Sequence, residues 1–172
     1  MKLKVKEITV FAMLGALIFA LKKVMEFLPN VHLVGVFIIA MTVVYRKKAL
    51  YPLYVYVFLD GLMGGFSTWW IPYIYIWTIL WGVTMLLPKN MNSKIAPIIY
   101  MVVCALHGFL FGTLYAPAQA LFFNLDFNGT IAWIVAGLPY DLIHGVSNFI
   151  CGIIIVPIIT ILKKVDKYAI KT

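Results

Sequence analysis

Apolar residues fill this chain in long runs that short polar or glycine-rich breaks separate. The breaks lie near residues 22–30, 46–48, 61–68, 88–94 and 116–130. A helix that crosses a membrane needs roughly 20 apolar residues, and most of the runs approach that length. The pattern predicts six transmembrane helices, at about 8–28, 31–45, 49–66, 69–88, 95–116 and 130–162.

The composition agrees with a membrane location. Hydrophobic residues make up 64% of the 172 positions and charged residues only 12%, which excludes an ordinary soluble globular domain. The first apolar run lacks a small-residue cleavage site, so we expect it to remain as the first helix. The sequence therefore predicts an all-α integral membrane protein, folded as a single domain over residues 1–172.

The basic residues indicate how such a chain would be oriented. On a six-helix path, twelve of the 14 fall on one side: Lys2, Lys4, Lys6, Arg46, Lys47, Lys48, Lys89, Lys94, Lys163, Lys164, Lys167 and Lys171. Positive charge marks the cytoplasmic side, so both termini of this multi-pass membrane protein are predicted to be cytoplasmic. Orientation accounts for the net charge of +8 without a nucleic-acid partner. The connection 116–130 would face outward, and it is long enough to form a lid.

Polar side chains within the apolar runs need a reason, because burying them in lipid is costly. Asp141, His144 and Asn148 stand at i, i+3 and i+7, which places them on one face of a helix. They are candidate substrate-binding residues, or alternatively a hydrogen-bond cluster that fixes helix packing. Lys22, Lys23 and Glu26 are also candidate ligand contacts, with a local ion pair as the alternative.

Aromatic residues are concentrated between residues 69 and 77. The preference of Trp and Tyr for membrane interfaces accounts for about half of them. Tyr73 and Trp77 are four residues apart and can share an inward face, where their rings would stack on a planar ligand. Trp70 joins them as a candidate substrate contact.

Small residues mark one face of the first predicted helix. Ala12, Ala16 and Ala20 are spaced four apart, with Gly15 beside them. Such a stripe lets a second helix approach closely within lipid, so it is a candidate docking surface for a partner protein.

No motif indicates chemistry within the chain itself. The sequence contains no phosphate-binding GxxxxGK[ST] loop, no clustered metal-ligand spacing and no GxSxG nucleophile motif. We therefore predict no catalytic residue, no metal and no cofactor, and expect that any ATP hydrolysis takes place on partner subunits.

Together these features resemble the substrate-binding S components of energy-coupling factor (ECF) vitamin transporters. The resemblance covers the whole length, and it includes the alanine stripe and the D-x-x-H-x-x-x-N pattern of residues 141–148. It implies a solute-binding subunit that docks through the stripe onto a transmembrane coupling subunit carrying two cytoplasmic ATPases. ATP hydrolysis there would topple the S component and release its solute inside.

The resemblance does not select a vitamin. Aromatic residues outnumber charges in the predicted pocket, which favours an uncharged, flat heterocycle of vitamin or nucleobase type. Two alternatives from other classes remain: a small intramembrane enzyme that uses Asp141 and His144 as a general acid/base pair, and a channel or structural subunit.

Overall fold

The computed structural model describes residues 3–170, and every regular element within them is helical. The elements are α1 (Val5–Val24), α2 (Val34–Tyr45), η1 (Arg46–Ala49), α3 (Leu50–Gly64), α4 (Ile71–Leu86), α5 (Ala96–Phe109), α6 (Phe111–Phe123), α7 (Phe127–Cys151), η2 (Gly152–Ile154), α8 (Ile155–Val165) and η3 (Asp166–Ile170).

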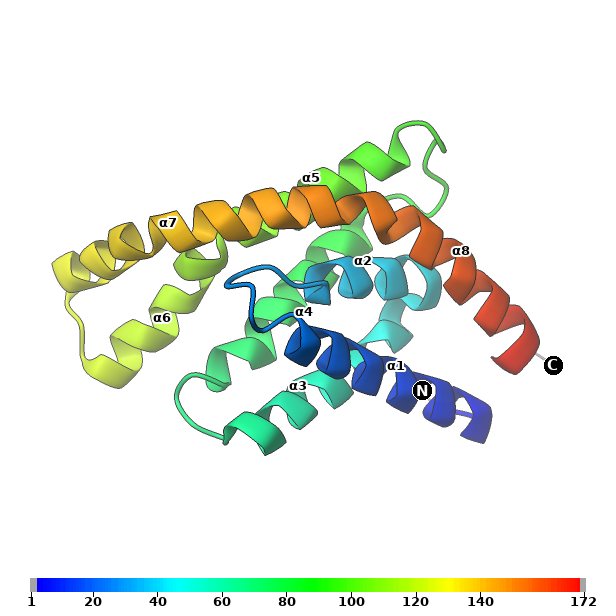
Figure 1. Ribbon diagram of the computed structural model, residues 1–172, viewed down its shortest axis with the longest axis horizontal. Helices are drawn as coiled ribbons and strands as arrows, with labels where there is room; N and C mark the ends of the chain where they lie inside the picture. Colours follow the sequence, from blue (N-terminus) through cyan, green and yellow to red (C-terminus); the bar gives the residue numbers. More distant parts are fainter. Residues whose placement is uncertain (1–2, 171–172) are drawn as a thin grey trace.

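The helices form a wedge that is open at one end (Figure 1). Helix α7 continues through η2 into α8 along one side of the molecule, with α5 packed against α7. Helices α1 and α3 pack together on the opposite side, and α2 and α4 lie between. The first turns of α1 and the last element, η3, lie at the same end of the molecule and contact each other.

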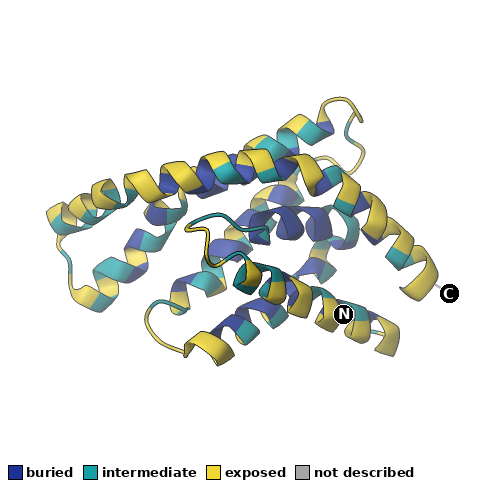
Figure 2. Ribbon diagram, in the orientation of Figure 1, coloured by how far each residue is buried: buried dark blue, intermediate teal, exposed yellow. Residues whose placement is uncertain are grey.

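Helix α2 forms the centre of the core. Its sequence, VGVFIIAMTVVY, is apolar on every face, and a helix of that kind is stable only when it is covered on all sides. Ten of its 12 residues are buried, and α4, α5, α8 and η1 pack around it. Figure 2 shows this contrast between a buried centre and outer helices that are exposed along one face.

Helix α1 packs on α3 through a position where only glycine fits. A Cβ added at Gly15 would lie 2.6 Å from the Cβ of Val55 and 2.8 Å from the carbonyl oxygen of Pro52. The absence of a side chain at Gly15 therefore sets the distance between the two helices.

We expect Gly15→Ala to lower the free energy of unfolding by about 1–3 kcal/mol, because the methyl group overpacks the α1–α3 contact. Gly82→Ala is the matched control, since no atom lies within 4 Å of a Cβ added at that helical position. The control should be neutral or stabilising by up to about 1 kcal/mol. Thermal unfolding in detergent measures both, and equal melting temperatures for the two variants would contradict the packing argument.

The prediction of six transmembrane helices is wrong for this structure. Within residues 3–170, only two continuous helical stretches are long and apolar enough to cross a membrane: Ala96–Phe123, of 28 residues, and Phe127–Ile170, of 44 residues. Helices α2, α3 and α4 have 12, 15 and 16 residues, fewer than the roughly 20 that a span needs. Helix α1 has 20 residues, but charged side chains occupy both of its ends.

The physical reason is that apolar runs continue beyond the ends of the helices. The chain leaves helical geometry at residues 25–33 and 65–70, although the flanking sequence stays largely apolar. The expected lid over residues 116–130 is also wrong, because α6 continues to Phe123 and α7 begins at Phe127. That connection is only three residues long.

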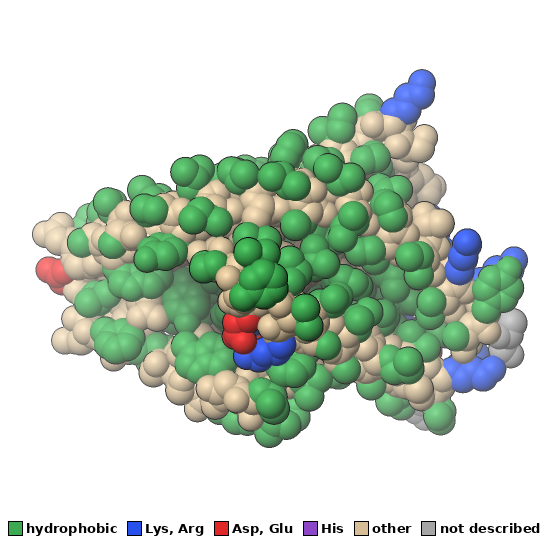
Figure 3. Space-filling view, in the orientation of Figure 1, with side chains coloured by type: hydrophobic (Ala, Val, Ile, Leu, Met, Phe, Trp, Pro, Cys, Tyr) green, Lys and Arg blue, Asp and Glu red, His purple; other side chains and the backbone are tan. Residues whose placement is uncertain are grey.

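The outer surface is apolar over the long sides of the molecule. Exposed large hydrophobic side chains lie on every α-helix except the buried α2, and Figure 3 shows them covering most of one face. Contiguous apolar surface on this scale is typical of contact with lipid or with other proteins. Lysine and arginine side chains gather mainly at the end of the molecule where the termini lie.

Candidate functional site

A cavity of about 170 Å³ lies where the end of α1 and the following loop meet α4, α6 and α7. Its walls are partly polar and partly aromatic. The lining residues are Lys22, Met25, Glu26, Leu28, Pro29, Asn30, Val31, His32, Tyr73, Phe111 and His144.

The loop formed by residues 25–33 covers one side of this cavity. Asn30 adopts a left-handed backbone conformation with φ 59°, which asparagine tolerates better than most residues. The Ser147 hydroxyl on α7 donates to the Asn30 carbonyl oxygen at 3.0 Å. This hydrogen bond holds the loop over the cavity and brings His32 to within 4.7 Å of His144, measured between ring centroids.

All three histidines of the chain gather in this region, although they come from three separate segments. His32 lies edge-on to Trp77 at 5.9 Å, and the His107 ring lies 5.3 Å from the same indole. Phe111 joins the group at 4.9 Å from His144. The Nε2 atom of His107 lies 3.1 Å from the Ile76 carbonyl oxygen and donates to it, which leaves Nδ1 as an acceptor.

Several polar atoms in this region are buried and make no hydrogen bond to any described residue. They are His32 Nδ1, Tyr56 OH, Trp77 Nε1, His107 Nδ1, His144 Nε2 and Asn148 Oδ1. A buried polar group without a partner destabilises a fold by about 1–3 kcal/mol, so folded proteins rarely keep one without a reason. Two of these atoms, His32 Nδ1 and His144 Nε2, belong to residues that line the cavity, and the other four lie on buried residues outside its lining.

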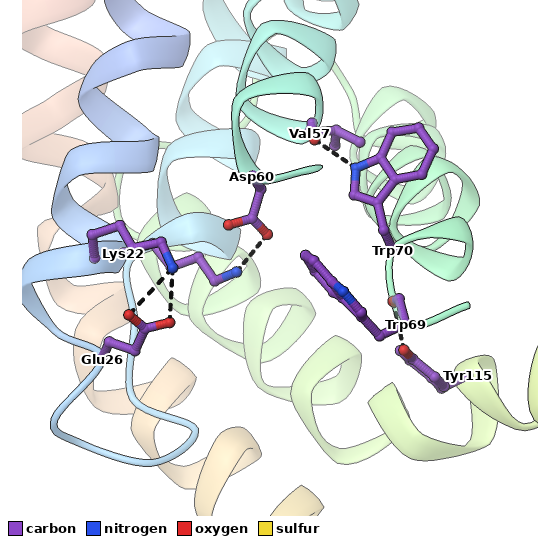
Figure 4. Close-up of polar contacts among 8 residues, drawn as sticks. Lys22, Glu26, Val57, Asp60, Trp69, Trp70 and Tyr115 are labelled. Carbon is purple, nitrogen blue, oxygen red and sulfur yellow. Dashed lines mark hydrogen bonds and ion pairs between the residues drawn. The ribbon is translucent and has the colours of Figure 1, made fainter. Parts of the chain in front are cut away.

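An ion pair joins α1 to α3 beside the cavity. Lys22 Nζ lies 2.5 Å from Asp60 Oδ2, and the two side chains are only 15% and 1% exposed (Figure 4). The same ammonium group lies 5.0 Å from the Tyr73 ring centroid, within cation–π distance. Lys23 and Glu26 form a second, more exposed ion pair at 3.0 Å. The two pairs leave the cavity rim without net charge.

Five of the sequence-predicted substrate contacts lie at or beside the cavity. Tyr73, His144 and Glu26 line it directly. Trp77 is buried behind the lining and contacts Tyr73 at 5.8 Å. Asn148 lies one helical turn from His144; its amide nitrogen donates to the Cys104 carbonyl oxygen at 3.2 Å while its Oδ1 stays unpartnered.

Three other predicted contacts lie outside the lining. Both carboxylate oxygens of Asp141 accept from the Gly112 amide, at 2.9 and 3.0 Å, which ties α7 to the first turn of α6. Trp70 donates from Nε1 to the Val57 carbonyl oxygen at 2.7 Å and fixes the α3–α4 connection (Figure 4). Lys23 contacts Glu26 and does not reach the cavity.

Lys22, His32 and Phe111 also line the cavity, and His107 contacts Trp77 beside it. The sequence reasoning weighed Lys22 with Lys23 and Glu26, but it did not select His32, His107 or Phe111. One signal was present: each histidine of this chain lies in or beside an apolar run, where a polar ring needs a partner. Phe111 carries no such signal, because a phenylalanine in an apolar helix is ordinary.

The alanine stripe is fully accessible in the structure. Ala12, Ala16 and Ala20 are all exposed, whereas Gly15 and Phe11 face the core. Helix α1 therefore presents a smooth face outward, on the side opposite to its packing against α3.

The arrangement is suited to binding. The described residues include no group of three or more His, Cys, Asp or Glu side chains positioned to share a metal ion. Asp141 is committed to a backbone amide, and its carboxylate is not part of the cavity lining to which His144 belongs.

Comparisons of the chain with protein-family models, with curated proteins and with solved structures find no match. The class of this protein must therefore be argued from its own residues.

Proposed function

We propose that this chain is the membrane-embedded solute-binding subunit of an energy-coupling factor importer. The chain is a multi-pass protein of the bacterial cell membrane. It captures a vitamin or related small heterocyclic micronutrient outside the cell. It delivers that solute inward by toppling when partner ATPases hydrolyse ATP.

The observation that carries the proposal is the pair of unpartnered polar atoms in the cavity lining, His32 Nδ1 and His144 Nε2. Tyr73 and Phe111 supply aromatic walls beside these two imidazole rings. A mostly apolar pocket with a few convergent polar groups is typical of small-molecule sites.

The volume of the cavity and the hydrogen-bonding groups in its lining narrow the class of solute. A cavity of about 150 Å³ accommodates benzene, so the 170 Å³ here fits a single ring or a small fused ring. The ring nitrogens of His32 and His144 in the lining can each donate or accept a hydrogen bond, depending on the tautomer. Those groups suit a flat, neutral nitrogen heterocycle that carries both N–H groups and ring nitrogens or carbonyls.

Energy for transport would come from other subunits. The described residues hold two apolar membrane-length stretches and an exposed small-residue face on α1. The expected partners are a transmembrane coupling subunit, docked on Ala12, Ala16 and Ala20, and two cytoplasmic ATPase subunits.

Mass spectrometry of the protein purified in mild detergent tests the proposal directly. A stoichiometric, neutral heterocycle that is released on denaturation is the expected result. Conversion of that molecule by the isolated chain would instead favour the enzyme alternative. Ion conductance in a planar bilayer without any retained molecule would favour a channel.

Substitution of the unpartnered groups separates binding from folding. We expect His32→Phe and His144→Phe to weaken solute binding about tenfold, since each removes one hydrogen bond to the solute of roughly 1–1.5 kcal/mol. The solute-free proteins should melt at the same temperature as the parent or higher, because the deleted atoms have no partner in it. Quenching of Trp77 fluorescence reports binding, and thermal unfolding reports stability.

Tyr75→Phe is the matched control. Its hydroxyl donates to the Leu114 carbonyl oxygen at 2.8 Å, away from the cavity lining. This variant should lose stability and keep its affinity. Lower stability with unchanged affinity in His32→Phe and His144→Phe would identify their polar atoms as structural.

A further inference from the structure

A second pocket, of about 320 Å³ and with four basic residues in its lining, lies at the end of the molecule where basic side chains gather. It is formed where α2 passes into η1 and by the last turn of α4 with the residues that follow it. Its lining residues are Tyr45, Arg46, Lys47, Lys48, Met85 and Lys89.

The charges of this pocket are only partly neutralised. Lys48 bonds to Glu7, and this contact holds the pKa of the Glu7 carboxyl below its usual range. Arg46, Lys47 and Lys89 form no ion pair with any residue between 3 and 170. Three cations around one concave surface attract an anion.

Arg46 is held in place independently of any anion. Its backbone has φ 53°, a left-handed conformation that is unfavourable for arginine. Two hydrogen bonds to α4 fix it: Nη2 donates to the Met85 carbonyl oxygen at 2.7 Å, and the Trp81 indole donates to the Arg46 carbonyl oxygen at 3.1 Å. The Arg46 Nε atom is buried with no described partner.

An apolar groove of about 730 Å³ adjoins this pocket, because Lys47 lines both. Apart from Lys47, the groove is made of residues of α3: Leu50, Tyr51, Tyr54, Val55, Phe58 and Leu59. From Leu50 to Leu59 the helix rises by about 14 Å, close to half of the ~30 Å hydrocarbon core of a bilayer. A phospholipid has an anionic headgroup and apolar acyl chains. The cationic pocket matches the headgroup, and the adjoining groove, about one leaflet long, matches an acyl chain.

We propose that this surface binds one anionic phospholipid. The headgroup phosphate lies against Arg46, Lys47 and Lys89, and an acyl chain lies along α3. The inference depends on the membrane location of the protein and on no property of the histidine cavity. The lipid would fix the depth of α3 at this end of the molecule.

Native mass spectrometry of the protein with phosphatidylglycerol or phosphatidylcholine tests this assignment. The parent protein should retain phosphatidylglycerol roughly tenfold better than phosphatidylcholine, since each basic group near the surface favours an anionic headgroup. Lys47→Gln/Lys89→Gln should lose that preference. Both side chains are exposed, so the variant should fold normally.

Two further variants keep the result interpretable. Lys163→Gln/Lys164→Gln removes the same charge from exposed positions of α8 outside the pocket and should retain the preference. Lys47→Arg/Lys89→Arg should retain it too. Equal preference in all four proteins would overturn the proposal, as would loss of the preference in the Lys163/Lys164 control. Inorganic phosphate at the same concentration as phosphatidylglycerol should not displace the lipid. Displacement would show that the pocket binds free phosphate and would overturn the proposal of a lipid site.

Discussion

Ala16→Trp is expected to abolish ATP-driven uptake while leaving solute binding by the isolated chain unchanged. Ala16 lies in the middle of the exposed face of α1, where a partner helix would approach closely. An indole at that position holds the two backbones apart and removes the van der Waals contact that drives helix association in lipid. Uptake by cells and co-purification of the coupling subunit measure the effect.

Leu17→Trp is the control for a large side chain on the same helix. Leu17 is also exposed, but it points about 100° around the helix axis from Ala16. This variant should transport normally. Normal uptake by Ala16→Trp, or equal loss in both variants, would remove the docking role of the alanine stripe.

Breaking the Lys22–Asp60 ion pair should produce the largest loss of stability. Asp60 is 1% exposed, so Lys22→Met leaves a buried carboxylate without its counterion, which costs about 3–5 kcal/mol. Asp60→Leu should cost less, because Lys22 is 15% exposed and its long side chain can move its charge toward water.

The double variant Lys22→Met/Asp60→Leu should recover much of the stability, since an apolar pair replaces a buried ion pair at little net cost. Thermal unfolding of the solute-free proteins gives this order. Additive losses in the double variant would show that the two side chains act independently of each other.

The sequence predicted much of the helical content but not the lengths of the helices. Each of the six apolar runs contains at least one helix, because hydropathy reports which residues avoid water. It does not report where the backbone stops being helical. Residues 25–33 remain largely apolar while they form a loop, and Leu110 interrupts the fifth run between α5 and α6.

The candidate site was predictable where two residues share a helix face. Tyr73 with Trp77, and His144 with Asn148, are four apart, and both pairs lie at or beside the cavity. Helical spacing says nothing about contacts between separate elements. His32 and Lys22 reach the cavity through the path of a loop and through an ion pair to α3, and no local pattern encodes either.

The same spacing argument does not account for the contacts of Asp141. Asp141 is three positions from His144, yet its carboxylate binds the Gly112 amide on α6. The break at Leu110 exposes that amide at the start of α6, where an acidic side chain is favourable. A break within an apolar run cannot be located from hydropathy, so this contact was not predictable.

The all-round burial of α2 has a consequence for the biosynthesis of the chain. The final covering of α2 comes from α8, through Ile155, Ile159 and Leu162, and the Tyr45 hydroxyl bonds to the Leu162 carbonyl oxygen at 3.4 Å, across 117 positions of sequence. During translation α2 leaves the ribosome long before that cover exists. Until residues 155–165 are made, its apolar surface must be shielded by the insertion machinery or by transient neighbours, so a nascent chain that stops short of α8 should be a substrate for membrane quality-control proteases.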